Sequence, residues 1–316
     1  MKKVIKRGIF ILVVAAAICV AGPVLAKEKV TLMLDWFPNI DHLPIYVAQQ
    51  AGYFDEAGLD VRILSPSETT DALKLAAANK VDIAVSYAPQ SIMGAAEGLR
   101  IRVIGRLVEH PLSVLLFLEG KGIDKPADME QKNIGYTVPG MMDILLDAFA
   151  KLNGIEEYQP INVGFSIVQS LVSGKVDAIM GPYKNYETVE LAEKGYRAAY
   201  FELGEWGIPD YDELVFISGE QAVEKRGPVL KAFVSAVARG IERTRENHQA
   251  ALEMYFAAVP EAPRDMETKA FRITLPLYAG NQALDVSRWQ TFADFADKYG
   301  LIERPVIVDG MLVNWH

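Results

Sequence analysis

The chain has 316 residues, of which 51% are hydrophobic, and it carries 41 Asp and Glu residues against 32 Lys and Arg residues. This acidic excess argues against nucleic acid or an anionic membrane surface as a partner. A single cysteine excludes a disulfide within the chain and a cysteine-ligated metal, and the four histidines do not cluster into a metal-binding motif.

The first 26 residues have the pattern of a cleaved secretion signal. A basic start is followed by an apolar run at 9–20 and by Val-Leu-Ala at 24–26, which fits the small-x-small cleavage rule. The apolar run is short for a membrane span and nothing similar recurs along the chain. We expect an exported mature chain that begins at Lys27 and has no cysteine. Cys19 follows an isoleucine, which argues against lipidation.

The remaining 290 or so residues exceed what one hydrophobic core usually serves, so we expect two lobes. Strands and helices alternate from Val30 onward, as in a mostly parallel sheet with helices on both faces. The expected strands of this first set are 30–34, 59–64, 81–86 and 101–107, and the expected helices are 45–51, 68–78 and 89–97.

A second alternating set follows, and the chain then becomes mainly helical. Strands are expected at 114–118, 134–137, 161–164, 178–181, 198–202 and 214–218. Helices are expected at 141–152, 167–173, 186–194, 229–245, 249–256, 265–270 and 287–299. Two sets of this kind predict an α/β protein with two lobes.

Polar and aromatic side chains crowd the loop after the first expected strand, in the stretch LDWFPNIDHLPIYVAQQAGYF (34–54). A loop from a strand to a helix lies at the carboxyl end of a parallel sheet, the usual place of a ligand site in open α/β folds. Taken singly, Trp36 is also consistent with the core and His42 with a helix cap. The density of the group favours a binding site formed by Asp35, Trp36, Asn39 and His42.

A ten-residue pattern occurs twice, as NKVDIAVSYA at 79–88 and GKVDAIMGPY at 174–183. Each copy places Lys, Val-Asp and an apolar strand before a tyrosine. The repeat suggests two similar lobes whose strand ends deliver Tyr87, preceded by Ser86, and Tyr183 to a cleft between them.

The segment GPYKNYE (181–187) continues the second copy into a helix and adds Asn185, Tyr186 and Glu187 to Tyr183. A carboxylate accepts two parallel N–H donors from a planar ring, and tyrosines stack on such a ring. The alternative for Glu187 is a favourable interaction of an acid with the first turn of its helix.

Two further segments supply weaker candidates. In GIPDYDEL (207–214), Asp210 and Asp212 fit an ordinary Pro-Asp turn, whereas Tyr211 and Glu213 are candidates for the cleft. In YTVPG (136–140), Tyr136 and Gly140 precede a helix, but its Met-Met-Asp opening makes a poor cradle for an anion. Motifs that bind nucleotides, the zinc motif HExxH and the nucleophile motif GxSxG are absent from the sequence.

Together these segments resemble the periplasmic solute-binding proteins of ABC importers, in the branch related to thiamine-pyrimidine synthases and to alkanesulfonate-binding proteins. The family pattern L-[DN]-W-x-P-[NT]-x-x-H is matched at 34–42, and Tyr-x-Asn-[Tyr/Trp]-Glu at 183–187. A segment similar to 207–214 occurs in bacterial importers of aminopyrimidine thiamine precursors. The resemblance implies a two-lobed type II binding-protein fold, a periplasmic monomer that delivers a small molecule to permease and ATPase subunits, and no cofactor.

The resemblance also implies limits for the lobes. We expect the first lobe at 27–110 and 218–316, the second at 111–217, and hinges near 109–113 and 217–220, so that ligand binding closes the lobes. The ligand it implies is a formylated or hydroxymethyl aminopyrimidine, stacked by Trp36 with Tyr183 or Tyr186 and paired with Glu187. Asn39, His42, Ser86 and Tyr87 would orient the remainder.

Departures from the family keep other possibilities open. In the synthases a lysine holds pyridoxal phosphate beside a histidine and a cysteine-rich loop. These positions correspond here to Ser86, Gln90 and 207–212, so that chemistry is missing. Sulfonate binders usually present Ser or Thr where this chain has Gly140 and Met141. Riboflavin or another flat heterocycle, an alkanesulfonate or taurine, an enzyme of the synthase type and a sensor remain as alternatives.

Overall fold

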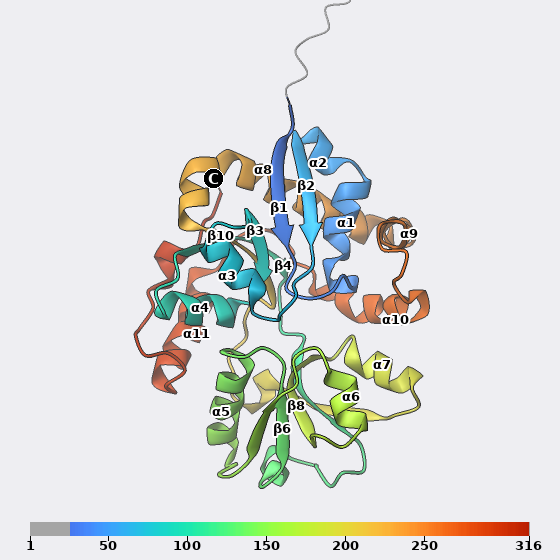
Figure 1. The fold of residues 1–316 in the computed structure, drawn as a ribbon, viewed down its shortest axis with the longest axis vertical. Coiled ribbons are helices and arrows are strands. Elements are labelled where there is room, and N and C mark those ends of the chain that lie inside the picture. The colour runs from blue at the N-terminus through green and yellow to red at the C-terminus, as the bar shows by residue number, and fades with distance from the viewer. Residues whose placement is uncertain (1–25, 316) are drawn as a thin grey trace, which may run out of the picture.

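The computed structural model describes residues 26–315, which form two five-stranded sheets flanked by helices (Figure 1). The expected secretion signal, with Cys19, lies outside the described residues except for Ala26. Within the described part of the chain, no helix has both the length and the apolar character needed to cross a membrane.

The first sheet has the strand order β2-β1-β3-β10-β4. β1 pairs in parallel with β2 and β3, whereas β10 runs antiparallel to both of its neighbours. The position of β10 between β3 and β4 means that this sheet is assembled from two separate parts of the chain. The strands are β1 (Glu28–Met33), β2 (Leu59–Leu64), β3 (Ile83–Ser86), β4 (Ile101–Val108) and β10 (Leu214–Gly219).

The second sheet repeats this arrangement in the order β7-β6-β8-β5-β9. β6 is parallel to β7 and β8, and β5 is antiparallel to β8 and β9. In each sheet the antiparallel strand between two others is the one that enters directly from the other sheet. The strands are β5 (Ser113–Leu118), β6 (Asn133–Tyr136), β7 (Gln159–Asn162), β8 (Ala178–Tyr183) and β9 (Ala198–Glu202).

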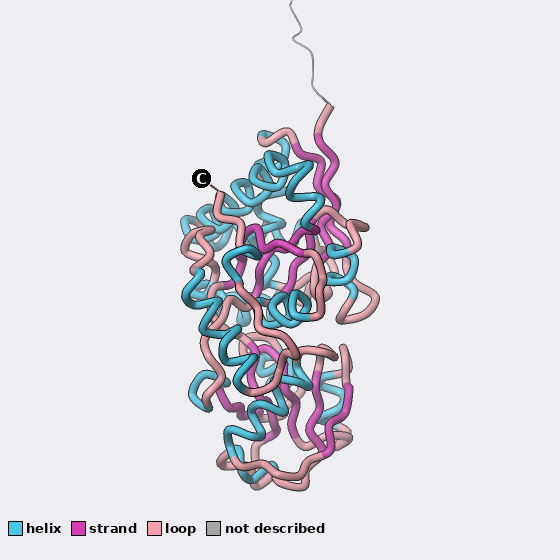
Figure 2. Tube along the Cα trace, turned by 90° about the vertical axis from the view of Figure 1, so that its left-hand side faces the viewer, coloured by secondary structure: helices cyan, strands magenta, loops and turns pink. Residues whose placement is uncertain are grey.

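The helices divide in the same way, and the two bodies lie one above the other in the side view of Figure 2. The first lobe comprises the first sheet with α1 (Leu43–Gln50), α2 (Tyr53–Glu56), α3 (Asp71–Ala77), α4 (Ala88–Ala96), α8 (Glu220–Glu246), α9 (His248–Ala258), α10 (Arg264–Thr274) and α11 (Val286–Lys298). The second lobe comprises the second sheet with α5 (Met142–Asn153), α6 (Ile167–Val172) and α7 (Glu187–Glu193). The short 3-10 turns are Ile40–His42, Pro126–Met129, Leu203–Trp206, Leu275–Leu277 and Val308–Met311.

All the expected strands and helices occur, within a few residues of their predicted ends, and α2 is an addition. Helix α8 begins at Glu220, ahead of the predicted 229, with non-helical backbone at Arg226 shortly before Pro228. The limits of the lobes themselves remain a prediction. Because β10 belongs wholly to the first sheet, the return into that sheet occurs before Leu214, earlier than the expected 217–220.

The repeated Val-Asp pattern has the same structural role in both sheets. The Asp82 carboxylate in the first lobe accepts a hydrogen bond from the N–H of Thr31 at 2.7 Å, and the Asp177 carboxylate in the second accepts one from the N–H of Asn133 at 3.0 Å. The backbone N–H groups of the two aspartates also donate, that of Asp82 to the Thr31 carbonyl and that of Asp177 to the Asn133 carbonyl. The pattern therefore fixes the register of two neighbouring parallel strands, as expected for two similar lobes.

Candidate functional site

A cavity lies between the lobes, at a boundary of the kind where small-molecule sites preferentially occur. Its lining combines carboxyl, amide and aromatic groups at the ends of strands from both sheets. Seven of the predicted site residues line it, namely Asp35, Trp36, Asn39, Tyr87, Tyr183, Tyr186 and Glu187. The other lining residues are Thr137, Val138, Met142, Ile167 and Gly181.

The Asp35 carboxylate is fixed at both oxygens. His42 Nε2 lies 2.9 Å from Asp35 Oδ1, and the Tyr87 hydroxyl donates to Asp35 Oδ2 at 2.8 Å. His42 Nδ1 accepts from the N–H of Asn39, so its Nε2 carries the hydrogen and donates to Asp35. His42 is buried and does not line the cavity. It orients Asp35 from behind, and it is also the third residue of a capping box with Asn39.

The loop of the first lobe meets the second lobe through aromatic rings. The rings of Trp36 and Phe165 form an edge-to-face pair with centroids 4.4 Å apart, and Phe37 lies 4.7 Å from the same Phe165 ring. Phe165 precedes α6, so these contacts cross the cavity's edge from lobe to lobe. Trp36 therefore both lines the cavity and packs against the second lobe, so it has features of a site residue and of a core residue.

Glu187 is the first residue of α7 and is almost completely buried. Its Oε2 accepts a hydrogen bond of 2.7 Å from the backbone N–H of Tyr183. Burial raises the pKa of Glu187 to about 8, against the opposing effect of that backbone hydrogen bond. Among the residues that line the cavity there is no lysine or arginine to compensate its charge. Glu187 can therefore share a proton with a basic nitrogen of a bound molecule.

A glycine shapes the wall of the cavity on the side of the second lobe. Gly181 has φ +104°, and a Cβ atom there would lie 2.3 Å from Thr137 Oγ1 and 2.9 Å from Met142 Cγ. A side chain at 181 is therefore excluded by both backbone conformation and space. Thr137 and Val138 follow β6, and their position at the carboxyl end of a strand was the sequence signal that could have found them.

The remaining predicted residues surround the cavity without lining it. Ser86 is buried, and its hydroxyl donates to Gln90 Oε1 at 2.9 Å. Tyr136 ends β6, and the exposed Gly140 donates its N–H to Asp143 Oδ1 at 2.7 Å. The amide of Asn185 contacts the first lobe instead of the cavity. Ligand contact by these four residues remains a prediction.

Tyr211 and Glu213 lie on the segment that returns to the first lobe. Both are buried outside the cavity lining. Glu213 Oε2 accepts the N–H groups of Leu112 and Ser113 at 2.6 and 2.8 Å, and Oε1 accepts the Ser113 hydroxyl at 3.0 Å. Burial raises the pKa of Glu213 to about 7. Glu213 thus joins the outgoing and returning segments to each other.

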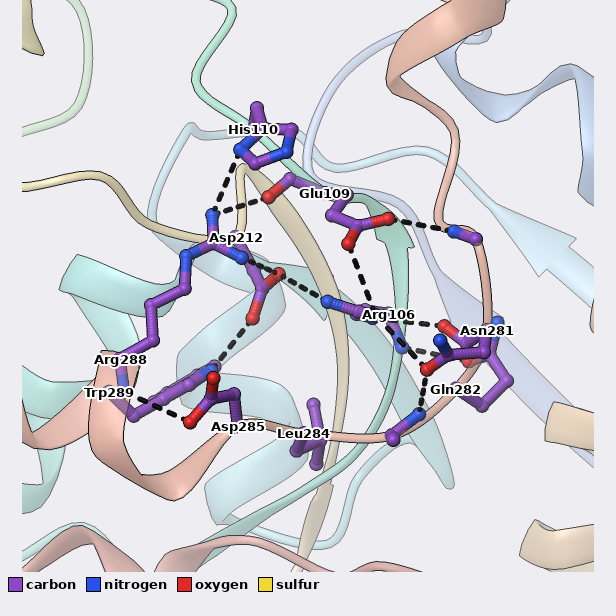
Figure 3. A network of polar contacts seen from close by, with 12 residues as sticks. Arg106, Glu109, His110, Asp212, Asn281, Gln282, Leu284, Asp285, Arg288 and Trp289 are labelled. Atoms are coloured by element: carbon purple, nitrogen blue, oxygen red, sulfur yellow. Dashed lines mark hydrogen bonds and ion pairs between the residues drawn. The ribbon is translucent and has the colours of Figure 1, made fainter.

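An arginine network ties the same two segments to the first lobe (Figure 3). Asp212 lies between Arg106 and Arg288, with N–O distances of 3.4 and 2.9 Å, and accepts the indole N–H of Trp289 at 2.7 Å. Arg288 also donates to the Glu109 carbonyl. Asp210 and Asp212, for which the sequence favoured an ordinary turn, belong to a charged network. Asp210 contributes through an ion pair of 2.8 Å with Arg288.

The described residues contain no group of three His, Cys, Asp or Glu side chains placed to hold a metal ion. What the cavity offers is acceptor oxygens, hydroxyl groups and aromatic surface. Such a set suits a neutral or cationic planar molecule with N–H donors.

Comparison with known proteins agrees with this geometry. The family described as NMT1/THI5 like matches residues 39–251. The formylaminopyrimidine-binding protein of Halalkalibacterium halodurans is 34% identical over 90% of this chain and 89% of its own. The 4-amino-5-hydroxymethyl-2-methylpyrimidine phosphate synthase of Legionella pneumophila is 28% identical over 80% of this chain and 81% of its own. The structure of the periplasmic aliphatic sulphonate binding protein SsuA from Escherichia coli superposes with a TM-score of 0.71 at 14% identity, covering 92% of this chain and 93% of that one.

Proposed function

Because the chain belongs to the NMT1/THI5-like family and has the periplasmic binding protein fold, we propose that it is the substrate-binding component of an ABC importer. It captures an aminopyrimidine precursor of thiamine, of the formylaminopyrimidine or hydroxymethylpyrimidine kind, in the cavity between the lobes. The observation that carries this proposal is the position of Glu187, a buried carboxyl group beside aromatic side chains in a cavity lined by no cation.

An aminopyrimidine presents an exocyclic N–H next to a ring nitrogen on one edge. The Glu187 carboxyl matches this edge, because one oxygen accepts from the amino group while the other shares a proton with the ring nitrogen. With its pKa raised to about 8 by burial, Glu187 holds that proton at neutral pH before the ligand arrives. Trp36, Tyr183 and Tyr186 supply the surfaces that stack on the ring.

The same lining disfavours anionic ligands. A sulfonate or phosphate in this cavity would face the Asp35 carboxylate with no lysine or arginine among the lining residues. The N–H of Gly140, at the start of the helix where an anion would bind, is already taken by Asp143. We therefore place alkanesulfonates and taurine below aminopyrimidines and neutral flat heterocycles such as riboflavin.

A binding role without catalysis is supported by the residue at position 86, which is a serine instead of the lysine that the synthases carry. Ser86 and Gln90, where synthases of this family carry lysine and histidine, are hydrogen-bonded to each other and buried. Neither forms an imine with pyridoxal phosphate. The relatives described as synthases share lower identity with this chain than the binding protein does.

The proposal extends to location and partners. A cleaved signal would deliver the chain to the periplasm, where it works as a monomer. The two segments that connect the lobes form a hinge, and closure around the ligand creates the surface that the permease recognises before the ATPase drives import. The proposed site residues are the seven that line the cavity, with Asn185 and His42 in support.

A thermal-shift panel on the mature chain tests the proposal. Hydroxymethylpyrimidine, formylaminopyrimidine, thiamine, riboflavin, pyridoxal phosphate and taurine are compared at equal concentration. A ligand at 100 times its Kd adds about 2.7 kcal/mol to the free energy of unfolding, which shifts Tm by several degrees. A shift with the aminopyrimidines alone supports the proposal, whereas a shift with riboflavin or taurine alone refutes the ligand. Absorbance with pyridoxal phosphate tests the enzymatic alternative, since an imine would contradict a pure binding role.

A further inference from the structure

A buried polar contact joins the two lobes beside the cavity. Asp41 lies in the 3-10 turn Ile40–His42 of the first lobe, and Asn185 lies between β8 and α7 of the second. Asn185 Nδ2 donates to Asp41 Oδ1 at 2.7 Å and to Thr274 Oγ1, on α10, at 2.6 Å. Both Asp41 and Asn185 have an exposed fraction of 0%. The contact therefore holds the lobes in the closed arrangement that the structure describes.

Two atoms of this contact lack a partner. Asp41 Oδ2 and Asn185 Oδ1 are buried without a hydrogen bond, although the other polar atoms of the same two groups are paired. Both are acceptors if Asp41 is ionised, so neither can satisfy the other. A proton on Asp41 Oδ2 changes this, because a carboxylic acid both donates to and accepts from a primary amide. Leaving two buried acceptors unpaired would be unfavourable.

We propose that Asp41 is a positioning residue for ligand capture, which holds a proton in the closed arrangement and forms a doubly hydrogen-bonded acid–amide pair with Asn185. Asn185 lies in the segment 183–187 that carries Tyr183, Tyr186 and Glu187, so the pair sets these side chains against the first lobe. Between about pH 4 and pH 6, closure then takes up one proton. The inference rests on the proposed function where it is tested by ligand binding, and is independent of it where it is tested by urea unfolding.

The groups around Asp41 determine how strongly the proton is held. On its own turn and the preceding loop lie His42, which favours the ionised form, and Asp35, which disfavours it. On α10 lie Thr274, as a hydrogen-bond donor, and Glu267; Glu187 on α7 also interacts with the Asp41 charge. The hydroxyls of Tyr183, Tyr186 and Tyr278 face the same charge.

The balance of these effects extends the pH range of the neutral acid upward to about pH 6. Burial raises the pKa of Asp41 to about 6 from the model-compound value of 3.8, against the opposing effects of His42 and of the hydrogen bonds from Thr274 and Asn185. A pKa raised in the closed form means that closure is favoured where Asp41 keeps its proton. This contribution is fully present below about pH 4 and is lost as the pH rises through about 6.

The variant Asp41→Asn tests the pair, because an asparagine donates to Asn185 Oδ1 and accepts from its Nδ2 at every pH. Calorimetric titration with formylaminopyrimidine is compared for wild type and variant from pH 4 to pH 8. The ratio of the two Kd values removes the titration of the ligand and of Glu187. We expect similar affinities at pH 4, and above pH 6 a variant that binds up to about 100-fold more tightly, since each pH unit contributes up to tenfold. Asp60→Asn, at an exposed position on β2, is the matched control and should follow wild type.

Urea unfolding of the ligand-free proteins provides the second measurement over the same pH range. Wild type should lose stability relative to Asp41→Asn between pH 4 and pH 6, with the sign set by the raised pKa. If the pH profiles of wild type and variant are parallel in both measurements, the acid–amide pair is refuted. If aminopyrimidines bind neither protein at any pH, the proposed function is wrong, and the urea series alone decides the pair.

Discussion

Two buried carboxyl groups near the connection between the lobes have different electrostatic surroundings. At the connecting segments, the buried Asp212 carboxylate is shared by Arg106 and Arg288 and by the indole N–H of Trp289. Beside the cavity, the buried carboxyl of Asp41 is hydrogen-bonded by Asn185 and Thr274, neither of which is charged. One side has cations for its buried carboxylate, and the other has only neutral donors.

This difference explains how one molecule combines a permanent connection with a reversible one. At Asp212 burial raises the pKa of the carboxyl group, but the charges of Arg288 and Arg106 and the hydrogen bond from Trp289 oppose that rise and favour the ionised form. Buried carboxyl groups without a cation have raised pKa values, as at Glu187, Glu267 and Asp41, and their interactions change with protonation or with an incoming ligand. The three predictions below disturb first the permanent side and then the reversible one.

The largest effect is expected at the connecting segments. Arg288→Ala would leave the buried Asp212 carboxylate with Arg106 as its remaining charged partner, at 3.4 Å. We expect a loss of about 3 kcal/mol in the free energy of unfolding, as for other broken buried ion pairs, measured by urea denaturation. The control is Arg264→Ala, which breaks an exposed ion pair with Glu253 and should cost at most about 1 kcal/mol. Equal losses of stability in the two variants would show that the buried Arg288–Asp212 pair contributes no more than an exposed ion pair.

The next effect concerns the ligand. Glu187→Gln keeps an oxygen to accept from the N–H of Tyr183 but removes the ionisable group that pairs with the ligand. Affinity for an aminopyrimidine should fall by about 1.5–3 kcal/mol, the range for a hydrogen bond to a charged group, in isothermal titration calorimetry. A variant that binds as tightly as wild type would show that a neutral partner suffices at this position.

A smaller effect is expected in the pH dependence of the ligand-free protein. Glu267 accepts from the N–H of Ile40 and from the Tyr255 hydroxyl, and burial together with the charge of Asp41 raises its pKa to about 8. Its neutral form is favoured by folding, so its contribution is present below about pH 4.5 and is lost as the pH rises through 8. Glu267→Gln should remove up to about 1.4 kcal/mol per pH unit of that loss in urea denaturation between pH 5 and pH 8. Unchanged slopes would contradict an uncompensated charge at Glu267.

The fold could be predicted well because its signals are local. Apolar strands alternate with helices at regular spacing, and the repeated Val-Asp pattern marks the same strand pairing in both sheets. The place of β10 between β3 and β4 could not be found in this way, since strand pairing over more than a hundred residues leaves no mark in the strand's own sequence. For the same reason the expected return at 217–220 fell inside a strand.

The site was predictable where residues follow strand ends and less so where partners come from elsewhere. Trp36, Tyr87 and Glu187 lie in segments whose composition already indicated a ligand. Asn185 belongs to such a segment too, yet its side chain is held by Asp41 and Thr274, which are distant in sequence. Gly181 was part of the repeated pattern, but only the proximity of Thr137 and Met142 explains why it is a glycine.

The position of β10 also has a consequence for the order in which the chain folds. The second sheet is encoded by one continuous stretch, from β5 to β9, and can be completed as soon as residue 202 has been synthesised. The first sheet lacks the strand between β3 and β4 until residues 214–219 emerge, and its covering helices α8 to α11 come later still. Because domains fold as units and long-range strand pairing is slow, the lobe that begins the chain should be the last to become native. During synthesis β3 and β4 therefore lack their shared partner β10 until residues 214–219 have been made.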